Sequence, residues 1–255
     1  MIPASPGTSN TGGPGVAVVC GAVFTIGGMP ALTAFQAAIV DLDGTMVDTV
    51  GDFEVALGRT LQDLGFQPVE RAFIQRTVGK GSEHLIRSTL AHVDAPLALY
   101  DRAWDRYQHH YLAINGQHSD VYPGVVEGLR ALRGAGLQLA CLTNKPTAFA
   151  RPLLAQKGLS DFFDQAFGGD AFARKKPDPL PLLETCKALG TQPSRTLMVG
   201  DSSNDAAAAR AAGCPVVLVN YGYNHGEPVE AAAPDAILSQ LDELPALLPR
   251  LLLAR

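Results

Sequence analysis

The order of apolar and polar positions divides the chain into strand-like and helix-like segments. One apolar run ends at Val40, and similar runs predict strands at residues 137–143, 166–167, 196–201, 216–219 and 236–238. Apolar residues at helical spacing, closed by glycine, predict helices at residues 50–64, 125–133, 147–157 and 205–212. Strands that alternate with helices of this length predict an α/β fold with a doubly wound parallel sheet.

A long helical segment interrupts this alternation after the first strand. Asp48 or Thr49 can cap its first helix, and further helices are predicted at residues 82–90 and 96–111 with no strand signal between them. The expected organisation therefore has three parts. These are a poorly ordered tail at residues 1–34, an α/β core at residues 35–49 and 120–255, and a helical cap domain inserted at residues 50–119.

The first 34 residues differ from the rest in composition. They begin rich in Pro, Gly, Ser and Thr and then become weakly apolar, but Pro30 and several glycines break the apolar stretch. No Lys or Arg occurs before Arg59, whereas a secretory signal needs a positive start. The segment is also too interrupted for a membrane span. Met29 opens a sequence that already holds every later element, which suggests it as an alternative start of translation.

The composition indicates which classes of binding partner the protein is expected to have. The hydrophobic share of 47%, the net charge of −5 and the pI of about 5.6 describe a globular protein and argue against nucleic acid as a main partner. We also expect no membrane partner, and the sequence carries no signal for an oligomeric state. The four cysteines have no metal-binding spacing, so reduced, buried thiols and a cytoplasmic location are expected. They are Cys20, Cys141, Cys186 and Cys214.

Asp41 and Asp43 follow the first apolar run directly. Residues i and i+2 of a strand point the same way, so both carboxylates can face one pocket. Two acids that close repel each other unless they share a proton or a bound cation. This pair, at the edge where open α/β sheets bind ligands, is the first candidate for chemistry.

Three further polar clusters are expected at the carboxyl ends of later strands. They are Thr143–Lys145, Lys175–Pro177 and Gly200–Asp205. Parallel strands bring these ends to one edge of the sheet, where carboxylates, a hydroxyl, an amide and an ammonium would meet. Acidic oxygen ligands suit Mg²⁺, and a hydroxyl with a lysine suits phosphate.

Taken together, these clusters resemble the four motifs of the haloacid dehalogenase superfamily, in its phosphoglycolate phosphatase-like branch. The resemblance covers the chain from about Phe35 onward. The segments that carry it, in order, are Asp41-Leu42-Asp43-Gly44-Thr45, Thr143-Asn144-Lys145, Lys176-Pro177-Asp178-Pro179 and Gly200-Asp201-Ser202-Ser203-Asn204-Asp205, followed by Tyr221-Gly222-Tyr223-Asn224.

The resemblance implies a role for each catalytic residue. Asp41 would be the nucleophile that forms an aspartyl-phosphate, and Asp43 would be the general acid and then the general base. The phosphoryl oxygens would be held by Thr143, Asn144 and Lys176.

The resemblance also implies a cofactor, Mg²⁺. Its ligands would be the Asp41 carboxylate, the backbone carbonyl of Asp43, and Asp201. Asp205 would support the waters of the metal or orient Lys176.

The substrate class is narrower than the superfamily. An acid at Asp43 favours an oxygen leaving group over dehalogenase or phosphonatase chemistry, and the resemblance implies 2-phosphoglycolate as the small phosphorylated substrate. Related enzymes act on sugar phosphates, nucleotides or pyrophosphate, or are phosphomutases. Two other classes stay open: an Asp-phosphorylated receiver domain and a catalytically silent ligand-binding relative. A receiver needs neither a general acid nor a lid, so residues 50–119 argue against it.

Lys80 has two interpretations. It lies just before a predicted helix that begins at Ser82, so it is either a solvated loop lysine or a contact for the carboxylate of the substrate. The histidines show no ligand spacing and are expected to have surface or packing roles.

Overall fold

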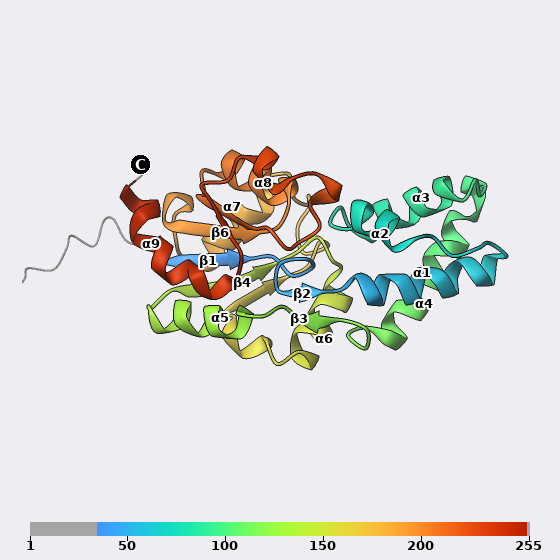
Figure 1. Ribbon diagram of the computed structural model, residues 1–255, viewed down its shortest axis with the longest axis horizontal. Coiled ribbons are helices and arrows are strands. Elements are labelled where there is room, and N and C mark those ends of the chain that lie inside the picture. Colours follow the sequence, from blue (N-terminus) through green and yellow to red (C-terminus); the bar gives the residue numbers. More distant parts are fainter. Residues whose placement is uncertain (1–34, 254–255) are drawn as a thin grey trace, which may run out of the picture. The chain divides into compact units, whose positions relative to one another are not determined.

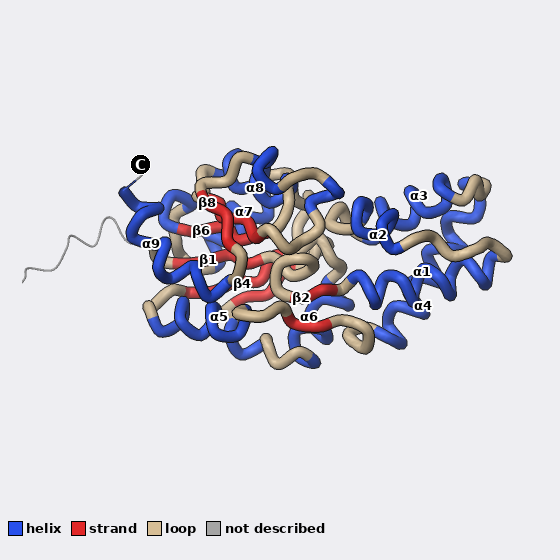
Figure 2. Tube along the Cα trace, in the orientation of Figure 1, coloured by secondary structure: helices blue, strands red, loops and turns tan. Residues whose placement is uncertain are grey.

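The computed structural model describes residues 35–253, and the tail expected at residues 1–34 lies outside them. Six strands form one sheet in the order β5-β4-β1-β6-β7-β8, and each neighbouring pair is parallel (Figures 1 and 2). They are β1 (Ala37–Val40), β4 (Gln138–Leu142), β5 (Gln165–Phe167), β6 (Thr196–Gly200), β7 (Val216–Val219) and β8 (Ala236–Leu238). This sheet confirms the predicted doubly wound α/β fold.

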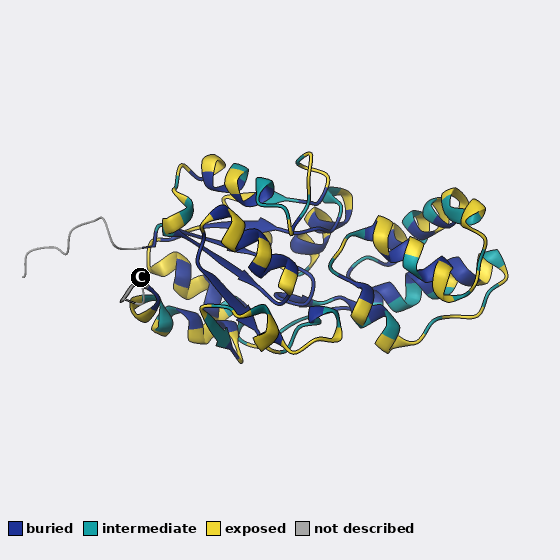
Figure 3. Cartoon of the chain, turned by 90° about the horizontal axis from the view of Figure 1, so that it is seen from above, coloured by how far each residue is buried: buried dark blue, intermediate teal, exposed yellow. Residues whose placement is uncertain are grey.

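Helices cover both faces of the sheet, and two apolar clusters fill the space between them (Figure 3). Even-numbered residues of β1 join one cluster and odd-numbered residues join the other, as strand alternation requires. The first face is covered by α5 (Val125–Gly134), α6 (Thr147–Gln156) and α9 (Leu244–Leu253). The second face is covered by α7 (Leu180–Ala188) and α8 (Ser203–Ala212). Burial on both faces explains why β1 reads as a continuous apolar run.

A separate group of helices follows β1 in the sequence (Figure 1). It consists of α1 (Val50–Leu64), α2 (Arg71–Thr77), α3 (Ser82–His92) and α4 (Tyr100–Ile114). These helices share their own apolar cluster, in which Tyr107 and Tyr111 are fully buried. Phe149 of α6 belongs to the same cluster and joins the helical group to the sheet-bearing part. The division into a core and a cap domain at residues 50 and 119 stays a prediction.

A short strand pair lies at the base of the helical group. β2 (Val47–Asp48) pairs antiparallel with β3 (Asp120–Val121). Close by, the buried Asp52 accepts hydrogen bonds from the backbone N–H groups of Gly116 and His118, both at 2.8 Å. These contacts join the start of α1 to the chain that follows α4. Two-residue strands have no periodicity, so the sequence pattern does not predict them.

Most predicted helix bounds agree with the structure, and the exceptions have local causes. The helix predicted at residues 96–111 begins as a 3₁₀ turn at Leu97–Leu99, and α4 then continues to Ile114. α8 begins before the predicted residue 205, because Ser202 and Asp205 form a capping box. At the start of α1, Thr49 is the N-cap residue, but its side chain makes no capping hydrogen bond. Asp48, the residue before it, accepts the Val50 N–H at 3.2 Å.

Two further expectations can be compared with the described residues. Cys141, Cys186 and Cys214 are buried and form no disulfide, whereas Cys20 lies outside the described part of the chain. Among residues 35–253, no helix combines the length and the apolar character needed to cross a bilayer.

Candidate active site

The first acidic pair lies where the central strand ends. β1 stops at Val40, and Asp41 stays attached to the sheet because its N–H donates to the Val199 carbonyl at 2.9 Å. Gly44 then turns the chain at φ +82°, and a Cβ there would collide with the Asp201 carboxylate. Asp41 and Asp43 therefore belong to a loop and not to the strand itself. Both still line one cavity, as their spacing predicts.

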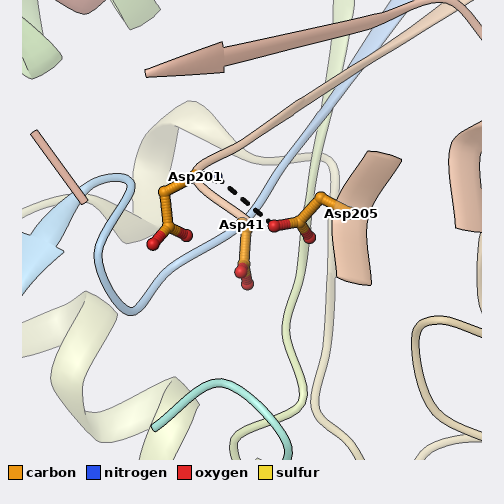
Figure 4. A group of neighbouring side chains, drawn as sticks. All are labelled: Asp41, Asp201 and Asp205. Carbon is orange, nitrogen blue, oxygen red and sulfur yellow. Dashed lines mark hydrogen bonds between the residues drawn. The ribbon is translucent and has the colours of Figure 1, made fainter. Parts of the chain in front are cut away.

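Three buried carboxylates gather at this edge of the sheet (Figure 4). Asp41 follows β1, Asp201 follows β6, and Asp205 lies in the first turn of α8. One ligand oxygen from each lies within 4.8 Å of those of the other two. Such a group of acids concentrates negative charge in a place from which water is largely excluded.

Burial is the main cause of the raised pKa values of two of these acids. It raises the pKa of Asp41 to about 7, opposed by the nearby Lys176 ammonium. It also raises the pKa of Asp201 to about 8, and the carboxylates of Asp205 and Asp41 add to the effect. A divalent cation with oxygen ligands fits this donor set.

Lys176 lies between two of the acids. Its Nζ donates to Asp205 Oδ1 at 2.7 Å and to the Leu142 carbonyl at 2.8 Å, and it lies 3.0 Å from Asp41 Oδ1. Burial lowers the pKa of Lys176, but the carboxylates of Asp205 and Asp41 outweigh burial and raise it above the ordinary lysine value. Lys176 is therefore a fixed positive charge beside Asp41.

Asp205 uses both oxygens for contacts within the protein. Oδ1 accepts from Lys176, and Oδ2 accepts from the Ser202 hydroxyl at 2.8 Å and from the backbone N–H groups of Asp201 and Ser202 at 3.3 and 3.2 Å. These contacts support the expectation that Asp205 orients Lys176. Asp201 is held differently, because it accepts from the Thr45 hydroxyl at 3.1 Å and the Tyr223 N–H at 2.8 Å.

Thr143 and Asn144 directly follow the end of β4, as predicted. The Thr143 hydroxyl accepts a hydrogen bond from the Lys145 backbone N–H at 3.1 Å. The Asn144 side chain is committed to backbone groups. Its amide donates to the carbonyls of Lys176 and Gly79 at 2.8 and 2.9 Å, and its oxygen accepts the Lys176 N–H at 3.0 Å. Asn144 thus orders the Lys176 loop and holds the loop between α2 and α3.

A small cavity lies between the acidic pair and the helical group. The sheet-bearing part contributes Asp41, Asp43, Thr143, Asn144 and Lys145, and the helical group contributes Phe53, Val78, Gly79, Gly81, Ser82 and Leu85. The cavity volume is about 20 Å³, which is room for one or two waters. A phosphate ester is much larger than this volume.

Lys145 is the functional candidate that the sequence prediction missed. Its Nζ lies 3.0 Å from Asp43 Oδ1 and donates to the Tyr111 hydroxyl at 2.5 Å. Its place directly after Asn144 was the available signal. Tyr111, from α4, could not be paired with it from the sequence because the two residues are far apart in the chain.

The structure does not bring Lys80 to this cavity. Lys80 is exposed and lines a separate, open groove with Arg87 and Lys175. Four residues of the predicted site line the cavity, namely Asp41, Asp43, Thr143 and Asn144. The other two are next to these residues: Lys176 contacts Asp41, and Asp201 accepts a hydrogen bond from Thr45 in the loop after Asp43.

Residues 38–219 match the family described as haloacid dehalogenase-like hydrolase. A phosphoglycolate phosphatase of Thiobacillus denitrificans is 42% identical over 211 residues, covering 82% of this chain and 93% of that protein. A phosphoglycolate phosphatase of Nitrosospira multiformis is 43% identical over 218 residues, covering 84% and 96%.

A solved structure has the same fold. It is a predicted phosphoglycolate phosphatase from Haemophilus somnus, with a TM-score of 0.81 and 30% identity, covering 84% of this chain and 97% of that chain. The family match spans more than half of the sequence and includes all four polar clusters in full. The chain belongs to the haloacid dehalogenase-like hydrolase family.

Proposed function

We propose that this protein is a Mg²⁺-dependent phosphatase that hydrolyses 2-phosphoglycolate to glycolate and phosphate through an aspartyl-phosphate on Asp41. One observation carries the proposal: Asp41 and Asp43 line one cavity, and Asp41 lies 3.0 Å from the Lys176 ammonium and in the same acidic cluster as Asp201. A buried nucleophile beside a second, independent acid is the arrangement that two-step phosphoryl transfer needs.

The chemistry divides between the two acids. A carboxylate oxygen of Asp41 bonds to phosphorus while the bond from phosphorus to the ester oxygen breaks, and Asp43 donates a proton to that leaving oxygen. Asp43, now ionised, takes a proton from a water that attacks the phosphorus and releases Asp41. The sum is one ester and one water converted to one alcohol and one phosphate.

The other predicted residues support the transferred group. The Thr143 hydroxyl and the positive charge of Lys176 lie beside Asp41, where the phosphoryl oxygens would be held. Asn144 contributes by fixing the backbone of Lys176 through two hydrogen bonds. Asp205 contributes by fixing the Lys176 ammonium.

Mg²⁺ is the cation proposed for the acidic cluster. Asp41, Asp201 and the backbone carbonyl of Asp43 would hold it, and the raised pKa values of Asp41 and Asp201 support a fit to a cation at this place. When bound, the ion supplies positive charge that lets an anionic carboxylate approach an anionic phosphate. Both oxygens of Asp205 accept hydrogen bonds from the protein, so we assign Asp205 to positioning Lys176 and not to binding the metal directly.

Residues 50–119 would act as a mobile cap over this site. The cavity of about 20 Å³ requires opening for substrate entry and product release. Closure would exclude bulk water while Asp41 attacks the phosphorus. The buried cysteines among the described residues form no disulfide, which supports the cytoplasmic location that we propose.

The substrate follows from the relatives, several of which are named phosphoglycolate phosphatase. Sugar phosphates, nucleotides and pyrophosphate are the alternatives, because the residues around Asp41 do not distinguish among them. A receiver domain is disfavoured by membership in a hydrolase family and by the helices over the site.

A panel of phosphate esters tests this function. With Mg²⁺, we expect kcat/KM for 2-phosphoglycolate to exceed that for sugar phosphates, nucleotides and pyrophosphate, and we expect EDTA to abolish turnover. The variant Asp43→Asn should lose most activity, whereas Asp161→Asn, an exposed control, should keep it. A poor kcat/KM for 2-phosphoglycolate beside a good one for another ester would reject the substrate and keep the chemistry.

A further inference from the structure

We propose that Lys145 is a positioning residue for Asp43, and that Tyr111 of α4 sets its position, so that the general acid is correctly placed only when the helical group is closed. The inference rests on the proposed function, because it concerns how Asp43 is held for that reaction. It assigns a role to a lysine and a tyrosine that the phosphatase mechanism above leaves unused.

The first support is the pattern of contacts on Asp43. Its Oδ1 accepts from the Thr49 hydroxyl at 2.7 Å and from Lys145 Nζ at 3.0 Å. Within the described part of the chain, both side-chain hydrogen bonds to Asp43 fall on this oxygen. Two donors on one oxygen fix the carboxyl plane, and they leave Oδ2 as the oxygen that can meet the ester.

The second support is the environment of Lys145 itself. Its side chain is 1% exposed, so its ammonium has left water and depends on protein partners. Those partners come from the helical group: the Tyr111 hydroxyl at 2.5 Å, and the rings of Phe53 and Tyr111, each with its centroid 4.5 Å from Nζ. The ammonium is therefore aligned by α1 and α4, although Lys145 follows β4.

The third support is that Tyr111 is suited to receive this contact. It is completely buried and packs against Phe53, Tyr107 and Phe149. Burial raises the pKa of Tyr111 well above its ordinary value, so the residue keeps its hydroxyl proton and accepts from Lys145 through oxygen. Opening of the helical group would withdraw Tyr111 and Phe53, and Lys145 would lose the partners that direct it toward Asp43.

Leaving-group dependence distinguishes this role from a general loss of structure. Two esters are compared: 2-phosphoglycolate, whose alkoxide is a poor leaving group, and p-nitrophenyl phosphate, whose p-nitrophenolate is a good one. Protonation of the leaving group by Asp43 matters for the first ester and matters little for the second. Single-turnover experiments with excess enzyme and Mg²⁺ measure the cleavage rate of each ester separately. A misplaced Asp43 lowers the cleavage rate of 2-phosphoglycolate more than that of p-nitrophenyl phosphate, whereas a lost phosphate contact lowers both rates equally.

The variants are Lys145→Met, Tyr111→Phe and the matched control Tyr107→Phe. Tyr107 lies one turn from Tyr111 in α4 and is equally buried, but its hydroxyl does not contact Lys145. We expect Lys145→Met to slow cleavage of 2-phosphoglycolate about 100-fold and p-nitrophenolate release less than about 5-fold. Tyr111→Phe should shift the ratio of the two rates in the same direction by about 10-fold, and Tyr107→Phe should leave the ratio unchanged.

Equal slowing of both esters in Lys145→Met and Tyr111→Phe, or wild-type ratios in both, would overturn the proposal. If Lys145→Met does not fold, the comparison of Tyr111→Phe with Tyr107→Phe decides alone, because both substitutions keep the buried ring. Failure of the proposed function looks different: the wild-type protein would then cleave neither ester with Mg²⁺.

Discussion

Asp41 and Asp43 carry the same functional group and lie two residues apart, yet their surroundings differ. Asp41 contacts Lys176 and lies in the acidic cluster with Asp201, whereas Asp43 contacts Thr49 and Lys145. In the mechanism that we propose, the first environment places the nucleophile beside Lys176 and the acidic cluster, and the second fixes the orientation of the proton donor. The different neighbours of the two acids, and not their spacing, support the different roles proposed for them.

Gly44 shows how one small residue supports this arrangement. A Cβ there would meet both an unfavourable φ of +82° and the Asp201 carboxylate. We expect Gly44→Ala to lower the free energy of unfolding by about 1–2 kcal/mol and kcat/KM by about 10–100-fold, because Asp201 is displaced. Chemical denaturation and steady-state kinetics measure the two effects.

Gly213 provides the matched control for that substitution. It ends α8 at φ +81° with no atom within 4 Å of the added Cβ, so Gly213→Ala carries the same backbone strain without the collision. It should cost about 1 kcal/mol of stability and leave kinetics unchanged. Equal kinetics in the two variants would show that the contact between Gly44 and Asp201 does not matter.

At the scale of the element, the main feature is how helices α1 to α4 contact the sheet-bearing part. They bury their own apolar cluster, and their contacts with the sheet-bearing part include Phe149 and the loop carbonyl of Gly79 as well as the contact of Tyr111 with Lys145. Asn144 and Asn204 both donate to the Gly79 carbonyl, at 2.9 and 3.2 Å, and Asn204 also lies 3.2 Å from His225 Nε2. In the mechanism that we propose, polar contacts of this kind would hold the cap closed and would break when it opens.

Asp52 joins the two ends of the helical group, and its loss should weaken that group. Asp52→Ala leaves the N–H groups of Gly116 and His118 without their acceptor, so we expect a loss of about 2–4 kcal/mol of stability in urea denaturation. Glu54→Ala is the control: Glu54 pairs with Arg71 at the surface, and its removal should cost less than about 1 kcal/mol. A similar cost for both variants would contradict the role given to Asp52.

At the scale of the whole molecule, the sequence predicted the sheet and most helices because their apolar periodicity is strong. It also predicted that Asp41, Asp43, Thr143 and Asn144 would converge, since parallel strands bring their ends to one edge. It did not predict the contact of Lys145 with Tyr111, nor the commitment of the Asn144 amide to backbone carbonyls. Those contacts depend on how the helical group packs against the sheet-bearing part, and no local pattern encodes that packing.

The metal site that we propose at the acidic cluster would link metal binding to the stability of the whole fold. Because burial raises the pKa of Asp41 to about 7 and of Asp201 to about 8, the folded protein holds protons that the unfolded chain has already released. Without a metal, these groups therefore make the free energy of unfolding fall as the pH rises from about 4 to about 8. Mg²⁺ competes with those protons, so it should stabilise the protein more at high pH.

Thermal unfolding with and without Mg²⁺ tests this linkage. At pH about 8.5, Mg²⁺ at about 100 times its Kd should add about 2.7 kcal/mol and raise Tm by roughly 5–10 °C. The increase should be much smaller at pH about 5.5, because both acids are then largely protonated. Asp201→Asn should lose most of the increase. An equal increase at both pH values, or one that survives in Asp201→Asn, would place the cation elsewhere.

The nucleophile is the central claim, and chemical trapping tests it most directly. Wild-type protein is mixed with Mg²⁺ and 2-phosphoglycolate, quenched in acid during turnover and treated with borohydride, which reduces an aspartyl-phosphate to homoserine. Mass spectrometry of the peptides should place homoserine at position 41, and Asp41→Asn should give no turnover and no homoserine. Turnover without homoserine at position 41, or with the reduced residue at another position, would contradict the account.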